Sequence, residues 1–243
     1  MNKLPLYKEV KNSIVQSLID GEWGPGELMP SEPRLAQRYS VGINTIRAAV
    51  GELVAANILL RHQGKGTFVS QHASSQGIYR FFSIVRSDGQ RDLPVRQFVS
   101  LRAGTADHKT AELLQLPRTR NGSKICKLTI LFKLGGKAVG FTRVTLPCSL
   151  FRGLSERGFE DGSVSLYALY QANYAVSVIR ITEMLGAVRA DATTAKALGL
   201  RAGEPVLEVS RTAYTFNDRP VELRRMYVDT RNYRYLVDHG AEM

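Results

Sequence analysis

Three polar side chains on one face of a short segment have the types and spacing that bind nucleic acid. Asn44, Thr45 and Arg47 carry amide, hydroxyl and guanidinium groups, which can reach phosphates and base edges if their helix lies in a DNA major groove. The opposite face of this segment is apolar at spacings of three and four, which predicts an amphipathic helix. Its apolar residues are Ile46, Ala49, Val50, Leu53 and Val54.

A second helix and a turn must position this one. Ser31 precedes an apolar run at Leu35, Ala36 and Tyr39, so we expect its hydroxyl to cap a helix by accepting a backbone N–H. Val41-Gly42 breaks that helix and leaves a tight turn before the next one.

A basic hairpin follows the two helices. Residues 58–61 and 67–69 are β-rich and flank a tip, residues 62–66, with the sequence His-Gln-Gly-Lys-Gly. This tip is thin enough to approach a DNA groove. Another helix, over residues 6–20, precedes these elements in the sequence, supports them by packing, and ends at Gly21. Together these elements predict a winged helix-turn-helix.

Over residues 5–69 the chain resembles the DNA-binding domain of the GntR family of bacterial transcription regulators. The matching pieces, in family order, are Pro5-Leu6-Tyr7, Gly21 with Pro25-Gly26, residues 28–32, Leu35-Ala36, Thr45-Ile46-Arg47 and residues 64–69. The resemblance implies a DNA-reading surface made of Ser31, Arg34, Asn44, Thr45, Arg47, Gly64, Lys65 and Thr67.

Two positions depart from the family pattern. Pro33 stands where an arginine usually follows the Ser-Glu pair, and Ile43 stands where an arginine usually follows the helix cap. Arg34 can take over the lost contact from about 100° further round its helix, and Asn44 can pair with adenine. We therefore expect an operator that depends less on guanine at that position. The alternative role for Asn44 and Thr45 is capping of the helix.

The net charge of +11 lies mostly outside this segment. Residues 1–75 hold eight basic and six acidic side chains, and the remaining residues hold 25 and 16. This excess attracts phosphates, biases a pocket toward anions, or is ordinary solvated surface. Charge alone supports a nucleic-acid partner only weakly, and the motif carries that prediction.

Composition indicates a cytoplasmic protein of two domains. A chain of 243 residues is long enough for two. No apolar run of the sequence approaches the roughly 20 residues of a membrane span, and no signal-peptide core precedes the first helix, so we expect no membrane partner. Cys126 and Cys148 lack metal-like spacing, and we expect both to stay reduced.

The second half of the chain has a different pattern. Residues 71–77 are small and polar and indicate a linker between one domain of residues 1–70 and another of residues 78–243. Strands then alternate with short helices, which predicts an α+β domain. The expected strands are residues 81–85, 95–101, 125–134, 138–146, 176–188, 206–216 and 220–228. The expected helices are residues 106–116, 166–172 and 192–198.

From about residue 80 to residue 238 the chain resembles the effector-sensing UTRA domain of the HutC branch of the same family. The resemblance rests on Phe82-Ser83, Ser165-Leu166-Tyr167, Ala195, Leu198-Gly199-Leu200, Gly203-Glu204-Pro205, Arg211 and Pro220-Val221-Glu222. It implies a chorismate-lyase-like antiparallel sheet with helices, dimerisation through this domain, and a small effector that alters DNA affinity. It also implies effector contacts from Ser83, Ser165, Tyr167 and Glu222.

The resemblance is incomplete at the anion clamp of the family. Ile130 and Phe132 stand where many relatives have two arginines, so we expect a less charged or aromatic effector rather than a phosphorylated sugar. The candidate replacement charges are Arg143, Arg224 and Lys133. Two simpler roles stay open: Ser165 only caps its helix, and Glu222 only forms a salt bridge.

These features predict a homodimeric transcription regulator, by default a repressor, that binds a pseudo-palindromic DNA operator and responds to a small metabolite. The alternative is an enzyme of chorismate-lyase-like fold tethered to a DNA-binding domain, and a third option is an architectural DNA-binding protein. The sequence holds no nucleophile elbow, phosphate-binding glycine loop or metal-spaced His/Cys set, so we expect no catalytic residue, metal or cofactor. The mobility of upstream DNA, with and without metabolites, separates the three.

Overall fold

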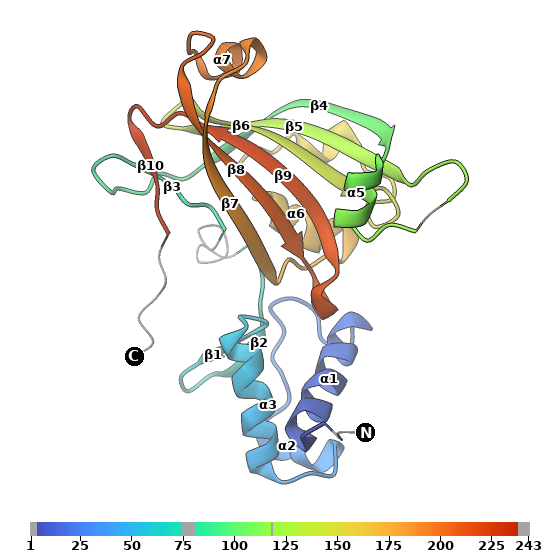
Figure 1. The fold of residues 1–243 in the computed structure, drawn as a ribbon. Helices are drawn as coiled ribbons and strands as arrows, with labels where there is room; N and C mark the ends of the chain where they lie inside the picture. Colours follow the sequence, from blue (N-terminus) through green and yellow to red (C-terminus); the bar gives the residue numbers. More distant parts are fainter. Residues whose placement is uncertain (1–3, 74–80, 118, 238–243) are drawn as a thin grey trace. The chain divides into compact units, whose positions relative to one another are not determined.

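The chain folds into two compact units, residues Met1–Gln71 and His72–Met243. The computed structural model in Figure 1 describes residues 4–73, 81–117 and 119–237. Residues 74–77 of the predicted linker lie outside the described residues. The confirmed fold class is a winged helix-turn-helix followed by an antiparallel sheet with helices.

The N-terminal unit is a three-helix bundle with a two-stranded wing. Its helices are α1 (Leu6–Ile19), α2 (Glu32–Arg38) and α3 (Ile43–Ala55), and its strands are β1 (Leu59–His62) and β2 (Gly66–Val69). The strands pair antiparallel, from Leu59 opposite Val69 to His62 opposite Gly66. The helical apolar stripes meet in one core, because each recurs at the helical period. Its buried members include Val10, Ile14, Leu18, Leu35, Ile46, Val50 and Leu53.

The predicted hydrogen bond from the helix to the Ser31 hydroxyl is wrong. Ser31 does occupy the N-cap position of α2, but its side chain makes no capping hydrogen bond. A capping hydroxyl accepts from the second or third residue of the helix. Pro33 is the second residue here and has no N–H to donate, so the usual arrangement loses one of its two donors.

The C-terminal unit is built on a six-stranded antiparallel sheet in the order β4-β5-β6-β9-β8-β7. The strands are β4 (Val95–Thr105), β5 (Lys124–Leu134), β6 (Lys137–Pro147), β7 (Arg180–Arg189), β8 (Pro205–Tyr214) and β9 (Pro220–Val228). A separate pair joins β3 (Ile84–Arg86) to β10 (Tyr233–Tyr235). Two 3-10 turns complete the unit, η1 (Glu156–Phe159) and η2 (Phe216–Asp218).

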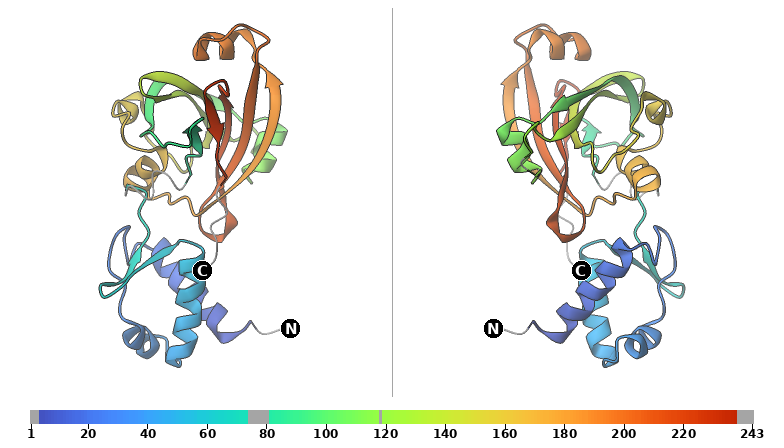
Figure 2. Two further views of the ribbon diagram at one scale, coloured as in Figure 1. Left: turned by 90° about the vertical axis from the view of Figure 1, so that its left-hand side faces the viewer. Right: turned by 90° about the vertical axis from the view of Figure 1, so that its right-hand side faces the viewer.

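The two faces of the sheet are covered differently. Helix α6 (Leu166–Tyr174) packs on one face, the inner face, whereas α5 (His108–Leu113) lies on the other, the outer face (Figures 1 and 2). Alternate residues of each strand point to the same face, so Leu128, Ile130 and Phe132 join the main core with α6. Helix α7 (Ala192–Leu198) packs on Phe141 at one end of the outer face.

Several predicted bounds differ from the structure in ways that hydrogen bonding explains. The strand predicted over 176–188 begins only at Arg180. The Val178 N–H donates to His72 Nε2 at 3.2 Å, and the Ile179 N–H donates to the Tyr214 carbonyl. The segment before Arg180 is therefore hydrogen-bonded without being part of the regular β7–β8 pairing. The helix predicted over 106–116 is shorter, because the Asp107 carboxylate caps it by accepting the Thr110 N–H.

The prediction of two reduced cysteines is also wrong. Cys126 and Cys148 form a disulfide, with Cα atoms 5.6 Å apart, within the range that such bonds require. The β5–β6 register pairs Cys126 with Leu146, so Cys148, two residues further on, lies diagonally opposite Cys126 on the same face. A separation of 22 residues gives no hint of this, since the contact depends on the register.

Gly162 has a conformation that a side chain would disturb. The Arg96 N–H donates to the Gly162 carbonyl at 2.8 Å, and a Cβ added at Gly162 would lie 2.0 Å from the Arg96 carbonyl oxygen. A backbone atom cannot move aside cheaply. This close approach holds the loop of residues 161–165 against β4.

We predict that Gly162→Ala destabilises the C-terminal unit by about 1–3 kcal/mol, the usual cost of overpacking. Gly158→Ala is the matched control, because its added Cβ meets no atom within 4 Å. Urea unfolding followed by circular dichroism measures both, while the single tryptophan, Trp23, reports on the N-terminal unit. Equal stability of the two variants would contradict the contact.

Candidate functional site

The first candidate surface lies on the N-terminal unit, around the start of α2 and the wing. Five of the predicted residues line one groove there: Ser31, Arg34, Gly64, Lys65 and Thr67. The other three lie on the first turn and a half of α3, where Asn44 and Arg47 are exposed and Thr45 is half-buried. Five of the eight predicted residues therefore share one groove, and the other three lie at the start of α3.

Glu32 connects the elements of this surface, and the sequence analysis did not single it out. Its Oε2 accepts from Arg47 Nε at 2.8 Å, and its Oε1 accepts from Arg61 Nη2 at 2.9 Å. One carboxylate at the start of α2 thus orients an arginine of α3 and an arginine of β1. Both arginine side chains stay more than half exposed, and exposed ion pairs contribute little stability, so the effect is on orientation.

The wing tip has the backbone shape that its glycines allow. Gly64 and Gly66 have φ values of +73° and +111°, which side-chain-bearing residues rarely adopt. Their turn closes with a hydrogen bond from the Lys65 N–H to the His62 carbonyl. Lys65 is left exposed at the tip.

The second candidate site lies on the inner face of the C-terminal sheet and contains a buried ion pair. Glu222 has no exposed surface. Arg224 donates to its two oxygens at 2.8 and 3.0 Å, and the hydroxyls of Tyr167 and Tyr170 donate at 3.1 and 2.7 Å. Burial raises the pKa of both tyrosines, and the Glu222 charge raises it further, so both stay protonated donors.

A second ion pair extends this network. Arg211 donates from Nε to the Glu183 carboxylate at 2.6 Å, from Nη1 to the Tyr167 hydroxyl at 3.3 Å and from Nη2 to the Phe81 carbonyl at 2.8 Å. The Tyr235 hydroxyl also donates to Glu183 at 2.7 Å. Strands β7, β8 and β10 are thereby tied to α6 through charged hydrogen bonds.

A narrow cleft, here called the inner cleft, adjoins this network. Its volume is about 40 Å³, counted as the space that the centre of a water molecule can occupy. Aromatic side chains and arginines line it, together with the loop that precedes α6. The lining residues are Phe81, Phe82, Pro94, Arg96, Phe132, Gly162, Ser163, Val164, Ser165, Leu166, Tyr167, Arg211 and Arg224.

The inner cleft brings together some of the predicted effector residues. Ser165, Tyr167 and Arg224 line it, and Glu222 lies behind Arg224 and Tyr167. The two simpler roles are both observed: the Ser165 hydroxyl accepts the Ala168 N–H as a helix cap, and Glu222 forms a salt bridge with Arg224. Ser83 is not among the lining residues, and its carbonyl accepts from Leu236.

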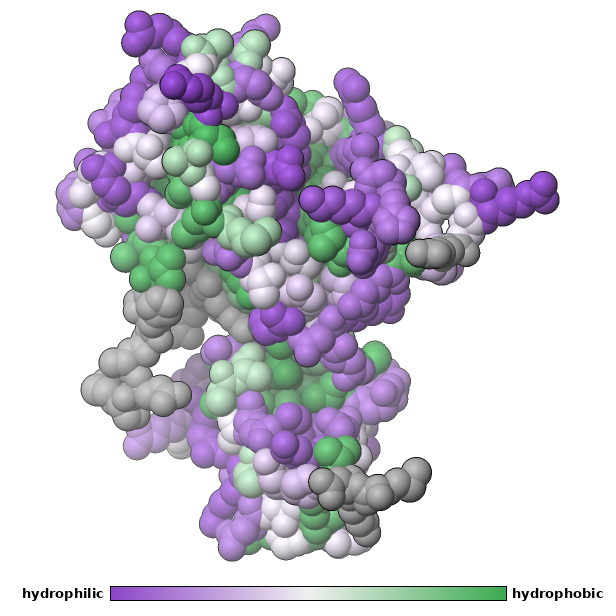
Figure 3. Space-filling model, viewed as in Figure 1, coloured by the Kyte–Doolittle hydropathy of each residue, from purple (hydrophilic) through white to green (hydrophobic). Residues whose placement is uncertain are grey.

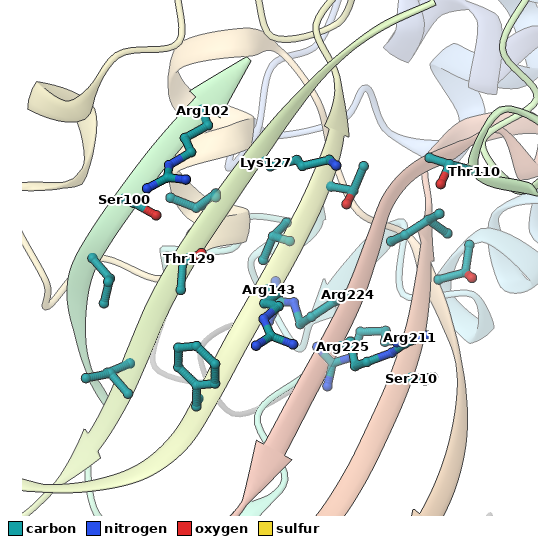
Figure 4. A pocket seen from close by; sticks show the side chains of 18 of the residues that line it. Ser100, Arg102, Thr110, Lys127, Thr129, Arg143, Ser210, Arg211, Arg224 and Arg225 are labelled. Carbon is teal, nitrogen blue, oxygen red and sulfur yellow. The ribbon is translucent and has the colours of Figure 1, made fainter. Parts of the chain in front are cut away.

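Arg143 points to the opposite face of the sheet from Glu222 and Arg224, because it pairs with Arg225 of β9, although Arg224 also borders the cavity that Arg143 lines. It lines an open trough of about 1520 Å³ on the outer face, between α5 and α7 (Figure 4). The register places Arg143 directly opposite Arg225, and Arg102 directly opposite Lys127. Like charges in such positions repel each other. The Asp191 carboxylate lies 3.7 Å from Arg143, which is a loose ion pair.

The trough and the inner cleft differ in the way they could hold a small molecule. Hydrophilic and hydrophobic residues alternate over the open face of the C-terminal unit (Figure 3). Small-molecule sites instead bury most of their ligand and place a few polar groups in an apolar lining. The inner cleft has that composition, so we take it as the effector-site candidate.

In residues 4–73, 81–117 and 119–237 no group of three His, Cys, Asp or Glu side chains could hold a metal ion. Within the same ranges, every helix is too short or too polar to cross a membrane.

Comparison with known proteins gives a consistent result for both units. Residues 6–69 match the gntR family of bacterial regulatory proteins, and residues 89–234 match the UTRA domain. The HTH-type transcriptional regulator YurK of Bacillus subtilis is 26% identical over 96% of this chain and 95% of its own length. The HTH-type transcriptional repressor NagR of Bacillus subtilis is 26% identical over 90% of this chain and 88% of its own.

A solved structure resembles the C-terminal unit. The ligand-binding domain of a GntR-family transcriptional regulator from Bordetella bronchiseptica superposes with a TM-score of 0.61 at 28% identity. The match covers 67% of this chain and 99% of that domain.

We predict that Glu222→Gln destabilises the C-terminal unit by about 3–5 kcal/mol, because it leaves the buried Arg224 guanidinium without a counter-charge. Glu208→Gln is the matched control on the outer face, where the carboxylate lies 3.8 Å from the exposed Arg225, and it should cost at most about 1 kcal/mol. Urea unfolding by circular dichroism separates the two. A similarly small loss of unfolding free energy in both variants would mean that the buried ion pair is not needed for the stability of the C-terminal unit.

Proposed function

We propose that this chain, since it belongs to the GntR family of bacterial regulatory proteins and carries a UTRA domain, is a repressor that a small molecule releases from its operator. Membership makes the protein a DNA-binding transcription regulator with an effector-binding C-terminal domain. Its relatives are transcription regulators, so the alternative of an enzyme is set aside. The direction, repression relieved by effector, is supported by relatives such as the repressor NagR.

The N-terminal surface supports a specific way of reading DNA. In a winged helix-turn-helix the second helix of the pair lies in the major groove with its N-terminal residues at the base edges. Asn44 and Arg47 are exposed there on α3, while Lys65 at the wing tip can approach a neighbouring groove. Ile43 is 37% exposed where relatives have arginine, so we propose that thymine methyl contact and Asn44–adenine pairing replace an arginine–guanine contact.

Arrangement as a homodimer supports recognition of a pseudo-palindromic operator. Dimeric readers place two recognition helices about one turn of DNA apart, so the two-fold symmetry of the protein matches that of the site. Effector binding would then change the population of dimers that fit this spacing. Linkage requires that DNA alters effector affinity by the same factor.

We predict that Arg47→Ala lowers operator affinity by about 1–3 kcal/mol, the usual cost of losing such a contact. Its affinity for effector should stay unchanged, because Arg47 belongs to the N-terminal unit. Arg201→Ala is the control for lost charge, since that side chain is 91% exposed in the C-terminal unit. Fluorescence anisotropy with labelled DNA from beside the gene measures both. Equal loss in the two variants would point to a general charge effect.

The dimer has its own test. Sedimentation equilibrium at the concentrations that bind DNA should give a mass twice the 27.0 kDa of one chain. A mass of one chain, both free and bound to the operator, would contradict the proposed arrangement.

A further inference from the structure

Arg96 is a buried cation with one unused hydrogen-bonding nitrogen. Only 4% of the residue is exposed. Its Nε donates to the Val164 carbonyl at 2.7 Å and its Nη2 to the Asp161 carbonyl at 2.6 Å, so one edge of the guanidinium is held by the loop before α6. Its Nη1 is buried and has no hydrogen-bond partner. Buried polar groups are nearly always paired, so this atom is a candidate donor to a ligand; four other buried side-chain atoms of the described residues also lack a hydrogen-bond partner, but none of them carries a positive charge.

The inner cleft that Arg96 lines has one positive charge too many. Three arginines line it: Arg96, Arg211 and Arg224. Glu183 neutralises Arg211, and Glu222 neutralises Arg224. Arg96 forms no salt bridge within the described residues; its hydrogen bonds go to two backbone carbonyls, and its guanidinium lies 5.8 Å from the centre of the Phe159 ring. The Asp161 carboxylate is exposed and bonded to Ser163. The buried side chains therefore sum to one uncompensated positive charge.

The size of the inner cleft limits what can enter at Arg96. By the same measure of volume, one water molecule needs about 10–15 Å³. The 40 Å³ of the cleft therefore holds a group of roughly three heavy atoms. A carboxylate has three heavy atoms and one negative charge. A phosphate monoester has more atoms and brings nearly two charges, which would leave an excess negative charge in a buried place.

The remaining wall of the inner cleft is apolar. The Phe82 and Phe132 rings lie with their centroids 5.3 Å apart and tilted by 55°, and Phe81 meets Tyr167 edge-on at 5.3 Å. Phe132 is one of the two positions where relatives carry an arginine of the anion clamp, and the register pairs it with Arg96 across β4 and β5. In this chain the guanidinium therefore lies on β4, the strand next to the clamp position. Phe132, at the clamp position on β5, is part of an aromatic wall.

We propose that the effector of this protein is an aromatic or apolar monocarboxylate, and that Arg96 is the residue that recognises its carboxylate. This rests on the proposed function of the C-terminal domain as the effector site. The carboxylate occupies the inner cleft and accepts from Arg96 Nη1, and the apolar body extends out of the cleft past its aromatic wall. The family clamp is absent here because Arg96 replaces it from β4.

The test compares ligands that share one body but differ in charge. Benzoate and 3-phenylpropanoate are the probes, with benzamide, 3-phenylpropanamide and phenyl phosphate as comparisons, at matched ionic strength. Isothermal titration should show binding of at least one carboxylate, tenfold or more weaker binding of its amide, and weaker binding of phenyl phosphate. A bound ligand should also raise the melting temperature as its concentration rises.

Variants assign the effect to Arg96. Arg96→Gln should lose at least tenfold in carboxylate affinity and bind acid and amide alike, because the charge that distinguishes them is gone. Arg96→Lys should restore part of the preference for the acid. Arg225→Gln, which removes an exposed arginine from the outer face of the same sheet, should bind like the parent. Circular dichroism and operator binding verify that each variant is folded.

The outcomes separate this inference from the proposed function. Tighter binding of phenyl phosphate than of benzoate, or no binding of any carboxylate, overturns the monocarboxylate proposal. Loss of carboxylate binding in Arg225→Gln but not in Arg96→Gln overturns the assignment to Arg96 and places the site in the outer trough. Neither result touches the DNA-binding function, which the Arg47→Ala comparison tests by itself.

Discussion

The Glu222 carboxylate carries a negative charge inside the C-terminal unit, where no solvent reaches it. Moving an ion out of water costs several kcal/mol unless partners replace the lost hydration. Four charged or hydroxyl hydrogen bonds, from Arg224, Tyr167 and Tyr170, supply that replacement. Because these partners come from β9 and α6, the position of the helix on the sheet is fixed by electrostatics as well as by apolar packing. The inner cleft has its shape because this network holds one of its walls.

The same rule explains why the inner cleft can select a ligand. Two of its three arginines are neutralised by a carboxylate, whereas the third, Arg96, donates its hydrogen bonds to backbone carbonyls and forms no salt bridge within the described residues. A site with one missing negative charge favours a ligand that supplies it. In the N-terminal unit Glu32 has a related role, since one carboxylate orients Arg47 and Arg61 on the surface that we propose reads DNA. In both units a carboxylate determines where arginines point.

The sequence was sufficient for the fold class, and the proposed DNA-reading residues come from the same local patterns. Helical periodicity located α1, α2 and α3, and two glycines located the wing tip.

The residues of the effector site were harder to predict. Arg143 was grouped with Arg224, although β6 places it on the outer face; Phe141 is buried on that face beneath α7, so apolar residues occur on both faces and conceal the alternation. The role proposed for Arg96 could not be predicted, because it depends on contact with a loop more than 60 residues away, which no local pattern reveals. The Cys126–Cys148 disulfide was missed for the same reason.

The central claim is that small-molecule binding in the C-terminal unit changes DNA affinity in the N-terminal unit. The most direct measurement is the dissociation constant for DNA from beside the gene, with and without the small-molecule fraction of a cell extract. The account predicts tight binding without the fraction and an affinity at least about fivefold lower with it, the lower end of usual coupling. DNA binding of equal strength in both conditions, over a range of extract concentrations, would contradict it.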